Sequence, residues 1–366
     1  MTGSLLDGDL GGIRPGATRK GPREVTPRVT LTDVARRAGV SIATVSYVMN
    51  GREGVADSTR AHVLSIAEEV GFRPNRLASG LRTGQSRVLA LVLADITNPF
   101  YPEIAGGVIS AAAEAGYEVF LSHSGVDGQL DAEEVRVLCD HRCAALLFTS
   151  LMVTDGPLIT DVVPAEVPLV QVVRRVPGLE ADFVGIDDRA GAREAARHLV
   201  DLGHRDVAIL IGPLGSSASR ERSRGFLETL AEAGLEPGPD RVAECQLTVD
   251  AGYEGAERLL AAGPDPPRAL LCGNDLIALG AIDAFLDHGL SVPGDVSVVG
   301  YDDIWFSSSR LVQLTTVRQP LDAMGRAAVS LALDRLADGD IEPRDVILPH
   351  EFVLRRTTAA PGRRAA

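Results

Sequence analysis

The turn Ala38-Gly39-Val40-Ser41, between two short helical patterns, constrains the fold of this chain more than any other feature. Thr30 can cap the first helix, and Asp33 stands three residues on as a near capping box. Gly39 permits the left-handed conformation that ends a helix, and Ser41 is a typical cap for the next one. The spacing therefore predicts two helices joined by a tight turn.

The second predicted helix has two different faces. Its inner face is apolar, and its outer face carries small residues and one aromatic: Ala43, Ser46, Tyr47 and Asn50. The inner stripe consists of Val45, Val48 and Met49. A helix of about ten residues with such an outer face suits the major groove of DNA. A third helix at about 58–70 would bury its own stripe and complete a small core.

The charge of the chain is divided unevenly between its two ends. The net charge is −14, but residues 1–84 hold 12 Lys and Arg against 8 Asp and Glu, for a net +4. Residues 85–366 hold 24 against 42, for a net −18. A basic head on an acidic body fits a small nucleic-acid module joined to a sensor.

Nothing in the sequence indicates a membrane segment, a cofactor or a metal site. There is no run of 18 apolar residues and no apolar signal core at the start, so we expect a cytoplasmic protein. Cys139, His141 and Cys143 lie close together but lack a fourth ligand at zinc-site spacing, so we interpret them as core residues. We expect no bound cofactor and no catalytic residues.

Beyond residue 87, short apolar runs alternate with helical stretches. The first set of runs is 88–94, 118–122, 144–148 and 169–173, and the second is 207–211, 242–246, 269–272 and 296–299. Four glycines close helices between them: Gly116, Gly203, Gly234 and Gly289. The alternation predicts parallel sheets covered on both faces, and two sets predict two doubly wound subdomains. Ligands bind at the carboxyl ends of such strands, so we expect a cleft between the lobes.

These motifs resemble the lactose-repressor (LacI/GalR) family of bacterial transcription regulators. The resemblance rests on Ala-Gly-Val-Ser-x-x-Thr-Val-Ser at 38–46 and Arg-Pro-Asn-Arg-x-Ala at 73–78. It extends over 88–357 through motifs such as Gly273-Asn274-Asp275 and Val299-Gly300-Tyr301-Asp302-Asp303. It implies an all-α helix-turn-helix DNA-binding head and an α/β core like a periplasmic binding protein, with two doubly wound parallel-sheet subdomains. It also implies a homodimer on a palindromic double-stranded operator, controlled by a small-molecule effector such as a sugar.

The motifs divide the chain into five parts. We expect a disordered tail at 1–27, a helix-turn-helix domain at 28–74, a hinge segment at 75–86, the effector-binding core at 87–357 and a second tail at 358–366. Within the core, the N-lobe takes about 87–188 and 317–346, and the C-lobe takes about 189–316 and 347–357. No leucine heptad follows Arg356, so a tetramer held by the tail is not expected.

The resemblance implies where the head contacts DNA. Ala43 and Tyr47 are expected to set base preference, and Leu81 is expected to wedge between base pairs when the hinge folds in the minor groove. An incidental leucine in a flexible linker is the alternative. The expected DNA-contacting residues are Thr30, Ser41, Ile42, Ala43, Thr44, Ser46, Tyr47, Asn50, Thr59, Asn75, Arg76, Ala78 and Leu81.

The resemblance also places the effector on an arginine, an asparagine and an aspartate, which match Arg222, Asn274 and Asp302. Asn and Asp also cap helices often, so a purely structural role is the alternative for each. The nearby aromatics that could stack on a ring, or else pack in the core, are Phe100, Tyr101 and Trp305.

The chain departs from the family at two informative positions. Many members have Val-Asp-Arg after the fourth strand, where this chain has Val172-Val173-Arg174. The missing acid disfavours a simple hexose and favours a disaccharide, a modified sugar or a nucleoside. At Tyr47 many members have arginine or histidine, and tyrosine cannot make the bidentate contact of arginine to guanine.

Functions other than that of a repressor fit the sequence pattern to different degrees. An activator, or a regulator that answers to a partner protein, would have the same sequence pattern. A solute-binding protein is disfavoured by the helix-turn-helix and by the missing signal core. An NAD-dependent enzyme is disfavoured because no G-x-G-x-x-G follows the first strand of the core.

Overall fold

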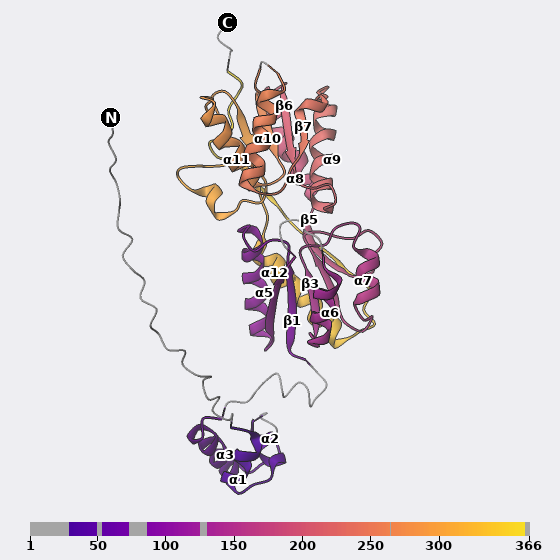
Figure 1. The fold of residues 1–366 in the computed structure, drawn as a ribbon, viewed down its shortest axis with the longest axis vertical. Coiled ribbons are helices and arrows are strands. Elements are labelled where there is room, and N and C mark those ends of the chain that lie inside the picture. The colour runs from indigo at the N-terminus through magenta and orange to yellow at the C-terminus, as the bar shows by residue number, and fades with distance from the viewer. Residues whose placement is uncertain (1–28, 50–52, 73–85, 125–129, 264, 363–366) are drawn as a thin grey trace, which may run out of the picture. The chain divides into compact units, whose positions relative to one another are not determined.

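The computed structural model describes residues 29–49, 53–72, 86–124, 130–263 and 265–362, and the chain divides into two compact units, Met1–Ser79 and Gly80–Ala366 (Figure 1). In the first unit, α1 spans Leu31–Ala38, α2 spans Ile42–Met49 and α3 spans Asp57–Glu69. Val34, Val45 and Val63, one from each helix, are fully buried against one another. The three predicted helices and their shared core are therefore present.

The N-lobe of the second unit is built on a six-stranded sheet with the order β11-β5-β4-β3-β1-β2, in which all neighbours are parallel. Its strands are β1 Val88–Leu93, β2 Glu118–His123, β3 Ala145–Phe148, β4 Leu169–Val172, β5 Asp182–Ile186 and β11 Asp345–Leu348. Alternate residues of β1 point into two separate clusters. Helices α5 (Phe100–Glu114) and α12 (Leu321–Ala337) cover one face, whereas α6 (Ala132–Asp140) and α7 (Gly156–Val162) cover the other.

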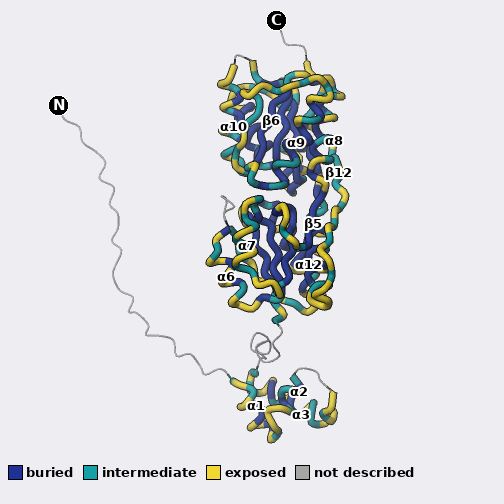
Figure 2. Tube along the Cα trace, turned by 90° about the vertical axis from the view of Figure 1, so that its right-hand side faces the viewer, coloured by how far each residue is buried: buried dark blue, intermediate teal, exposed yellow. Residues whose placement is uncertain are grey.

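The C-lobe repeats this construction on a four-stranded parallel sheet with the order β7-β6-β8-β9. Its strands are β6 Val207–Ile211, β7 Val242–Glu244, β8 Ala269–Cys272 and β9 Ser297–Val299. Helices α8 (Asp188–Asp201) and α9 (Ser217–Glu232) cover one face, and α10 (Val249–Ala261) and α11 (Asp275–Asp287) cover the other. The inner strands of both sheets are buried on both faces (Figure 2), which explains their continuous apolar runs.

The chain also forms strands that the sequence pattern did not predict. Besides β5 and β11, β10 (Thr316–Arg318) and β12 (Glu351–Val353) form an antiparallel pair between the lobes. β5 contains Asp182 and Gly185, and β11 is half-exposed, so neither gives an apolar run. The expected lobe boundary at 346 falls inside β11, all four residues of which pair with β5.

Helices α5 and α12 approach so closely that glycine is required at one contact. A Cβ at Gly107 would collide with the backbone carbonyl of Asp322 at the start of α12. The adjacent Gly106 faces solvent, and a Cβ there would meet nothing within 4 Å. Position 107 therefore has no room for a side chain, whereas position 106 does.

We predict opposite effects on stability for alanine at these two positions. Gly106→Ala should raise the free energy of unfolding by about 0.5–1 kcal/mol, because glycine inside a helix costs conformational entropy. Gly107→Ala should lower it by about 1–3 kcal/mol, because the added methyl group overpacks the contact. Urea unfolding followed by circular dichroism checks both variants, and a loss of equal size in the two would contradict the close approach.

Candidate DNA-reading helix and effector cleft

Local hydrogen bonds cap the amino ends of α1 and α2 in the head. The Thr30 side chain accepts from the backbone N–H of Asp33 at 3.4 Å, and the Asp33 carboxylate accepts from the backbone N–H of Thr30 at 3.0 Å. Gly39 adopts the left-handed conformation with φ 64°. Ser41 caps α2 by accepting from the backbone N–H of Thr44 at 3.0 Å. The sequence-predicted capping box and cap are thus both formed.

The face of α2 opposite the core is open to solvent. Ile42 and Tyr47 are 47% and 45% exposed, Ala43 is exposed and Ser46 is half-buried. Val45 and Val48 are buried on the inner face, and Thr59 is half-buried on α3. Five further expected DNA contacts lie outside the described residues: Asn50, Asn75, Arg76, Ala78 and Leu81. The described part of α2 offers a continuous surface on which side chains can contact a ligand.

In the second unit, two adjoining cavities lie between the lobes. Their shared lining comes from both lobes and consists of Asn98, Tyr101, Arg174, Ser216 and Leu247. Five of the expected effector residues line the second cavity: Phe100, Tyr101, Arg222, Asn274 and Asp302. Trp305 lines neither cavity; it is 60% exposed and stacks on Phe306 with ring centroids 3.5 Å apart. The larger cavity has a volume of only about 30 Å³, so the lobes must separate to admit a sugar ring.

Arg222, in the second turn of α9, lies at the centre of a buried ion cluster. Its Nε donates to Asp188 at 2.7 Å, and its Nη1 donates to Asp302 at 3.1 Å and to the carbonyl of Gly273 at 2.7 Å. The guanidinium also lies 3.8 Å from the ring centre of Tyr301. One side chain therefore joins the start of α8, the end of β8 and the loop after β9.

The cluster keeps its charges despite complete burial. Burial raises the pKa of Asp302 to about 6, and the Arg222 guanidinium limits that rise. The pKa of Asp188 is raised by burial and lowered by Arg222 in the same way. Burial lowers the pKa of Arg222, but the two carboxylates raise it above its ordinary value. We conclude that Arg222 remains a cation and that its charge favours the ionised form of both aspartates.

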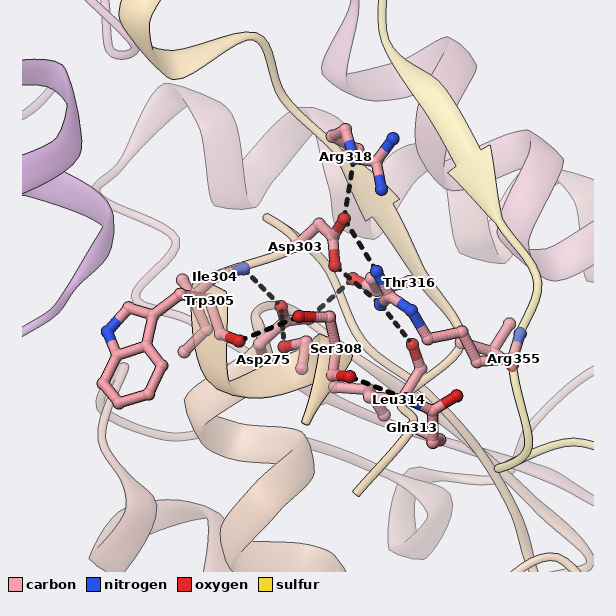
Figure 3. Close-up of polar contacts among 12 residues, drawn as sticks. Asp275, Asp303, Ile304, Trp305, Ser308, Gln313, Leu314, Thr316, Arg318 and Arg355 are labelled. Carbon is pink, nitrogen blue, oxygen red and sulfur yellow. Dashed lines mark hydrogen bonds and ion pairs between the residues drawn. The ribbon is translucent and has the colours of Figure 1, made fainter. Parts of the chain in front are cut away.

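A second polar cluster supports the loop that carries Asp302. Asp275 accepts from the Ile304 backbone N–H at 3.0 Å, from the Ser307 hydroxyl at 2.6 Å and from the Thr316 hydroxyl at 2.6 Å (Figure 3). Asp303 pairs with Arg318 at 2.7 Å and with Arg355 at 2.6 Å. Asp302 has φ 112° and Asp303 has φ 56°, so these contacts hold an unfavourable backbone in place.

Several residues of the cleft were not among the expected effector contacts. They include Asn98, Arg174 and Ser216, which line both cavities, and Val173, which lines the second. Asn98-Pro99-Phe100 follows β1, so the position of Asn98 after a strand end could have indicated that this residue lines the cleft. Val173 combines a β-branched side chain with φ 68°, a conformation that such residues rarely adopt.

Comparison with known proteins agrees with this architecture. Residues 30–75 match the model described as bacterial regulatory proteins, lacI family, and residues 196–358 match a periplasmic binding protein-like domain. The chain is 30% identical to the HTH-type transcriptional regulator DegA of Bacillus subtilis over 91% of this chain and 98% of that protein. It is 32% identical to catabolite control protein A of Priestia megaterium over 90% of this chain and 99% of that protein.

The chain belongs to the LacI family. Among solved structures, a lac repressor dimer bound to operator and the anti-inducer ONPF matches with a TM-score of 0.81 and 30% identity, covering 91% of this chain and 100% of that one. A complex of the transcriptional regulator CelR with cellobiose matches with a TM-score of 0.68 and 33% identity, covering 90% and 100%. This LacI-family chain is a transcriptional regulator with a helix-turn-helix head and a core like a periplasmic binding protein.

We predict that Arg222 stabilises the core mainly by pairing two buried carboxylates. Arg222→Met should lower the free energy of unfolding by about 3–5 kcal/mol, because both aspartates would be left unpaired. Without the cation, the pKa values of Asp188 and Asp302 rise further, so the folded state binds protons more readily and the loss should be smaller at pH 5 than at pH 8.

The matched control lies two residues along the same helix. Arg224 pairs with Glu221 on the surface, so Arg224→Met should change the free energy of unfolding by no more than about 0.5 kcal/mol. Urea unfolding of both variants at the two pH values is the measurement. Equal losses in Arg222→Met and Arg224→Met, or a loss independent of pH, would show that the cluster is not electrostatic in origin.

Proposed function

We propose that this protein is a repressor of a metabolic operon, which binds a palindromic operator as a homodimer and is controlled by a small polar effector in the cleft between its lobes. The proposal rests on one observation: the same chain has an exposed face on α2 and a cleft lined by polar groups from both lobes. Because its target is chromosomal DNA, the protein acts in the cytoplasm, with no cofactor and no catalytic role.

The outer face of α2 is proposed to enter the major groove. Ala43 and Tyr47 are exposed there and would contact base edges, while Thr30 and Ser41 lie at the amino ends of α1 and α2. Helix amino ends bind phosphate through backbone N–H groups, so these two residues would fix the position of the head on the duplex. Two-fold symmetry of a dimer would require two equivalent half-sites.

The effector is proposed to act by changing the separation of the lobes. The cleft is narrow, and residues from both of its sides would contact a ligand. The lobes are connected through the 186–188 segment, β10 and the segment after β11, so a change in the cleft changes their relative position. The coupling between effector and DNA would amount to about 1–3 kcal/mol in a typical allosteric protein.

We predict that Tyr47 determines one symmetric base pair of the operator. Tyr47→Arg should change the preferred base at that position, with a discrimination of about 1–3 kcal/mol, because arginine makes a bidentate contact to guanine that tyrosine cannot make. Selection of binding sites from randomised duplexes gives the preferred sequence of each protein. Arg36→Met is the control, since Arg36 is an exposed residue of α1 that pairs with Asp33. Identical preferred sequences for wild type and Tyr47→Arg would refute the assigned role.

The effector role of the cleft is tested on the selected operator. Asn274→Ala should keep operator affinity within about threefold while losing the response to the effector, because the side chain lines the cavity and belongs to the second unit. Fluorescence anisotropy with labelled operator and a library of small metabolites measures both properties. Loss of operator binding with an unchanged ligand response would place the effector site elsewhere.

A further inference from the structure

At the edge of the cleft, the side-chain oxygens of three residues accept hydrogen bonds from backbone N–H groups at helix starts, whereas their side-chain donors remain without a partner in the described residues. The Asn98 side-chain oxygen accepts from the Phe100 backbone N–H at 3.1 Å, and that of Asn274 accepts from Ile277 at 2.9 Å. Ser216 caps α9 by accepting from the backbone N–H of Ser219 at 3.5 Å. Among the described residues, no acceptor is supplied for the two amide NH₂ groups or for the Ser216 hydroxyl hydrogen. These walls of the cleft therefore demand acceptors from a ligand.

Arg174 adds a buried cation without a counter-ion. It is only 6% exposed and lines both cavities, yet no carboxylate in the described part of the chain lies within 4.0 Å of its guanidinium. Its Nη2 donates to the Tyr101 hydroxyl at 2.8 Å, and its Nη1 lies 3.6 Å from the Met152 sulfur. Arg222, which is equally buried, has two carboxylate partners. A buried charge without a partner is unfavourable, and no described residue supplies a carboxylate to Arg174, so an anionic ligand would stabilise it.

Tyr101 strengthens this donor site. Burial raises its pKa, so the hydroxyl keeps its hydrogen. The oxygen accepts from Arg174, and no described residue accepts the hydroxyl hydrogen. Arg174 and Tyr101 therefore form an adjacent pair of donors, of which one is permanently charged. Such a pair fits a carboxylate or phosphate oxygen.

Most carboxylate oxygens near the cleft already accept hydrogen bonds; among the described lining residues, Oδ2 of Asp95 and Oδ2 of Asp302 do not. Asp188 and Asp302 pair with Arg222. Asp95, at the edge of the first cavity, accepts from the backbone and hydroxyl of Thr97. Asp155 accepts from the backbone N–H of Met152 at 2.7 Å and lies beyond ion-pair distance of Arg174. Oδ1 of Asp302 accepts from Arg222 and Gln319, and Oδ2 of Asp302 accepts from no described residue, so this carboxylate oxygen in the second cavity can accept from a ligand.

We propose that the effector is an acidic polyhydroxylated molecule, a sugar that carries a carboxylate or phosphate group. Its anionic group pairs with Arg174 and Tyr101, and one of its hydroxyl groups donates to Asp302 across the cleft. This inference rests on the proposed function and names the class of effector for the same cleft. Val173 in the lining of the second cavity agrees with it, because a carboxylate at that position would repel the anion.

The first test measures thermal unfolding of the full chain at matched ionic strength. The probes are sodium phosphate, D-gluconate and D-glucose 6-phosphate, compared with D-glucose, D-galactose and sodium chloride. At least one acidic probe should raise the Tm of the wild type by about 2 °C or more above the neutral sugars. Gluconate and glucose 6-phosphate distinguish a carboxylate from a phosphate. Absence of any such difference would overturn the proposal.

The second test separates a ligand site from a structural arginine. Arg174→Met should raise the Tm of the protein without added probe, because it removes an unpaired buried charge, and should abolish the shift caused by acidic probes. Arg136→Met in α6, which removes an exposed arginine of the same lobe, should keep the wild-type Tm and the wild-type shift. A lower Tm for Arg174→Met without added probe, or an undiminished shift, would contradict the assignment.

The third test keeps this proposal distinct from the proposed function. The selected operator is titrated with wild type, and the bound complex is challenged with each probe. Release by a neutral sugar, equal in wild type and Arg174→Met, would reject the acidic effector but retain the regulator. Failure to select any DNA sequence would reject the regulator itself, whatever the thermal shifts show. Release by an acidic probe in wild type, weakened at least tenfold in Arg174→Met, is the expected result.

Discussion

The buried ion cluster around Arg222 is the interaction on which the C-lobe side of the cleft depends. It connects four segments that are far apart in the sequence: the starts of α8 and α9, the end of β8 and the loop after β9. Gln319, just after β10, also donates to Asp302 at 2.8 Å, so the segment that leads back to the N-lobe joins the same cluster. Because the charges are paired within the protein, this side of the cleft keeps its shape without a ligand.

The opposite side of the cleft has the contrary electrostatic character. Arg174 is as deeply buried as Arg222 but pairs with a hydroxyl and a sulfur instead of carboxylates. A wall on which Arg222 pairs with two carboxylates thus faces a wall on which no described carboxylate pairs with Arg174. A ligand that neutralises Arg174 would bind most tightly in the arrangement of the lobes that lets the ligand contact both walls. Binding would therefore stabilise that arrangement, which is the physical basis for an effector-controlled change of shape.

The head follows a simpler principle, in which nearly all determinants are local. The Thr30–Asp33 capping box starts α1, and the left-handed Gly39 with the Ser41 cap forms the turn between α1 and α2. Small apolar side chains from all three helices then complete the core of the head. Ile42, Ala43 and Tyr47 of α2 are exposed on the side away from this core.

The sequence by itself determined the features that depend on neighbours along the chain. These are the caps and turn of the head, eight of the parallel strands, and the left-handed glycines that end helices, such as Gly116 and Gly203. It did not reveal β5 and β11, since their pairing partners lie far away and their own pattern is not apolar. Only the tertiary structure left Trp305 outside the cleft and brought Arg174 into it, beyond ion-pair distance of every described carboxylate. The physical reason is that the free energy of a buried charge depends on the groups around it. Those groups come from distant parts of the sequence, and only the fold brings them together.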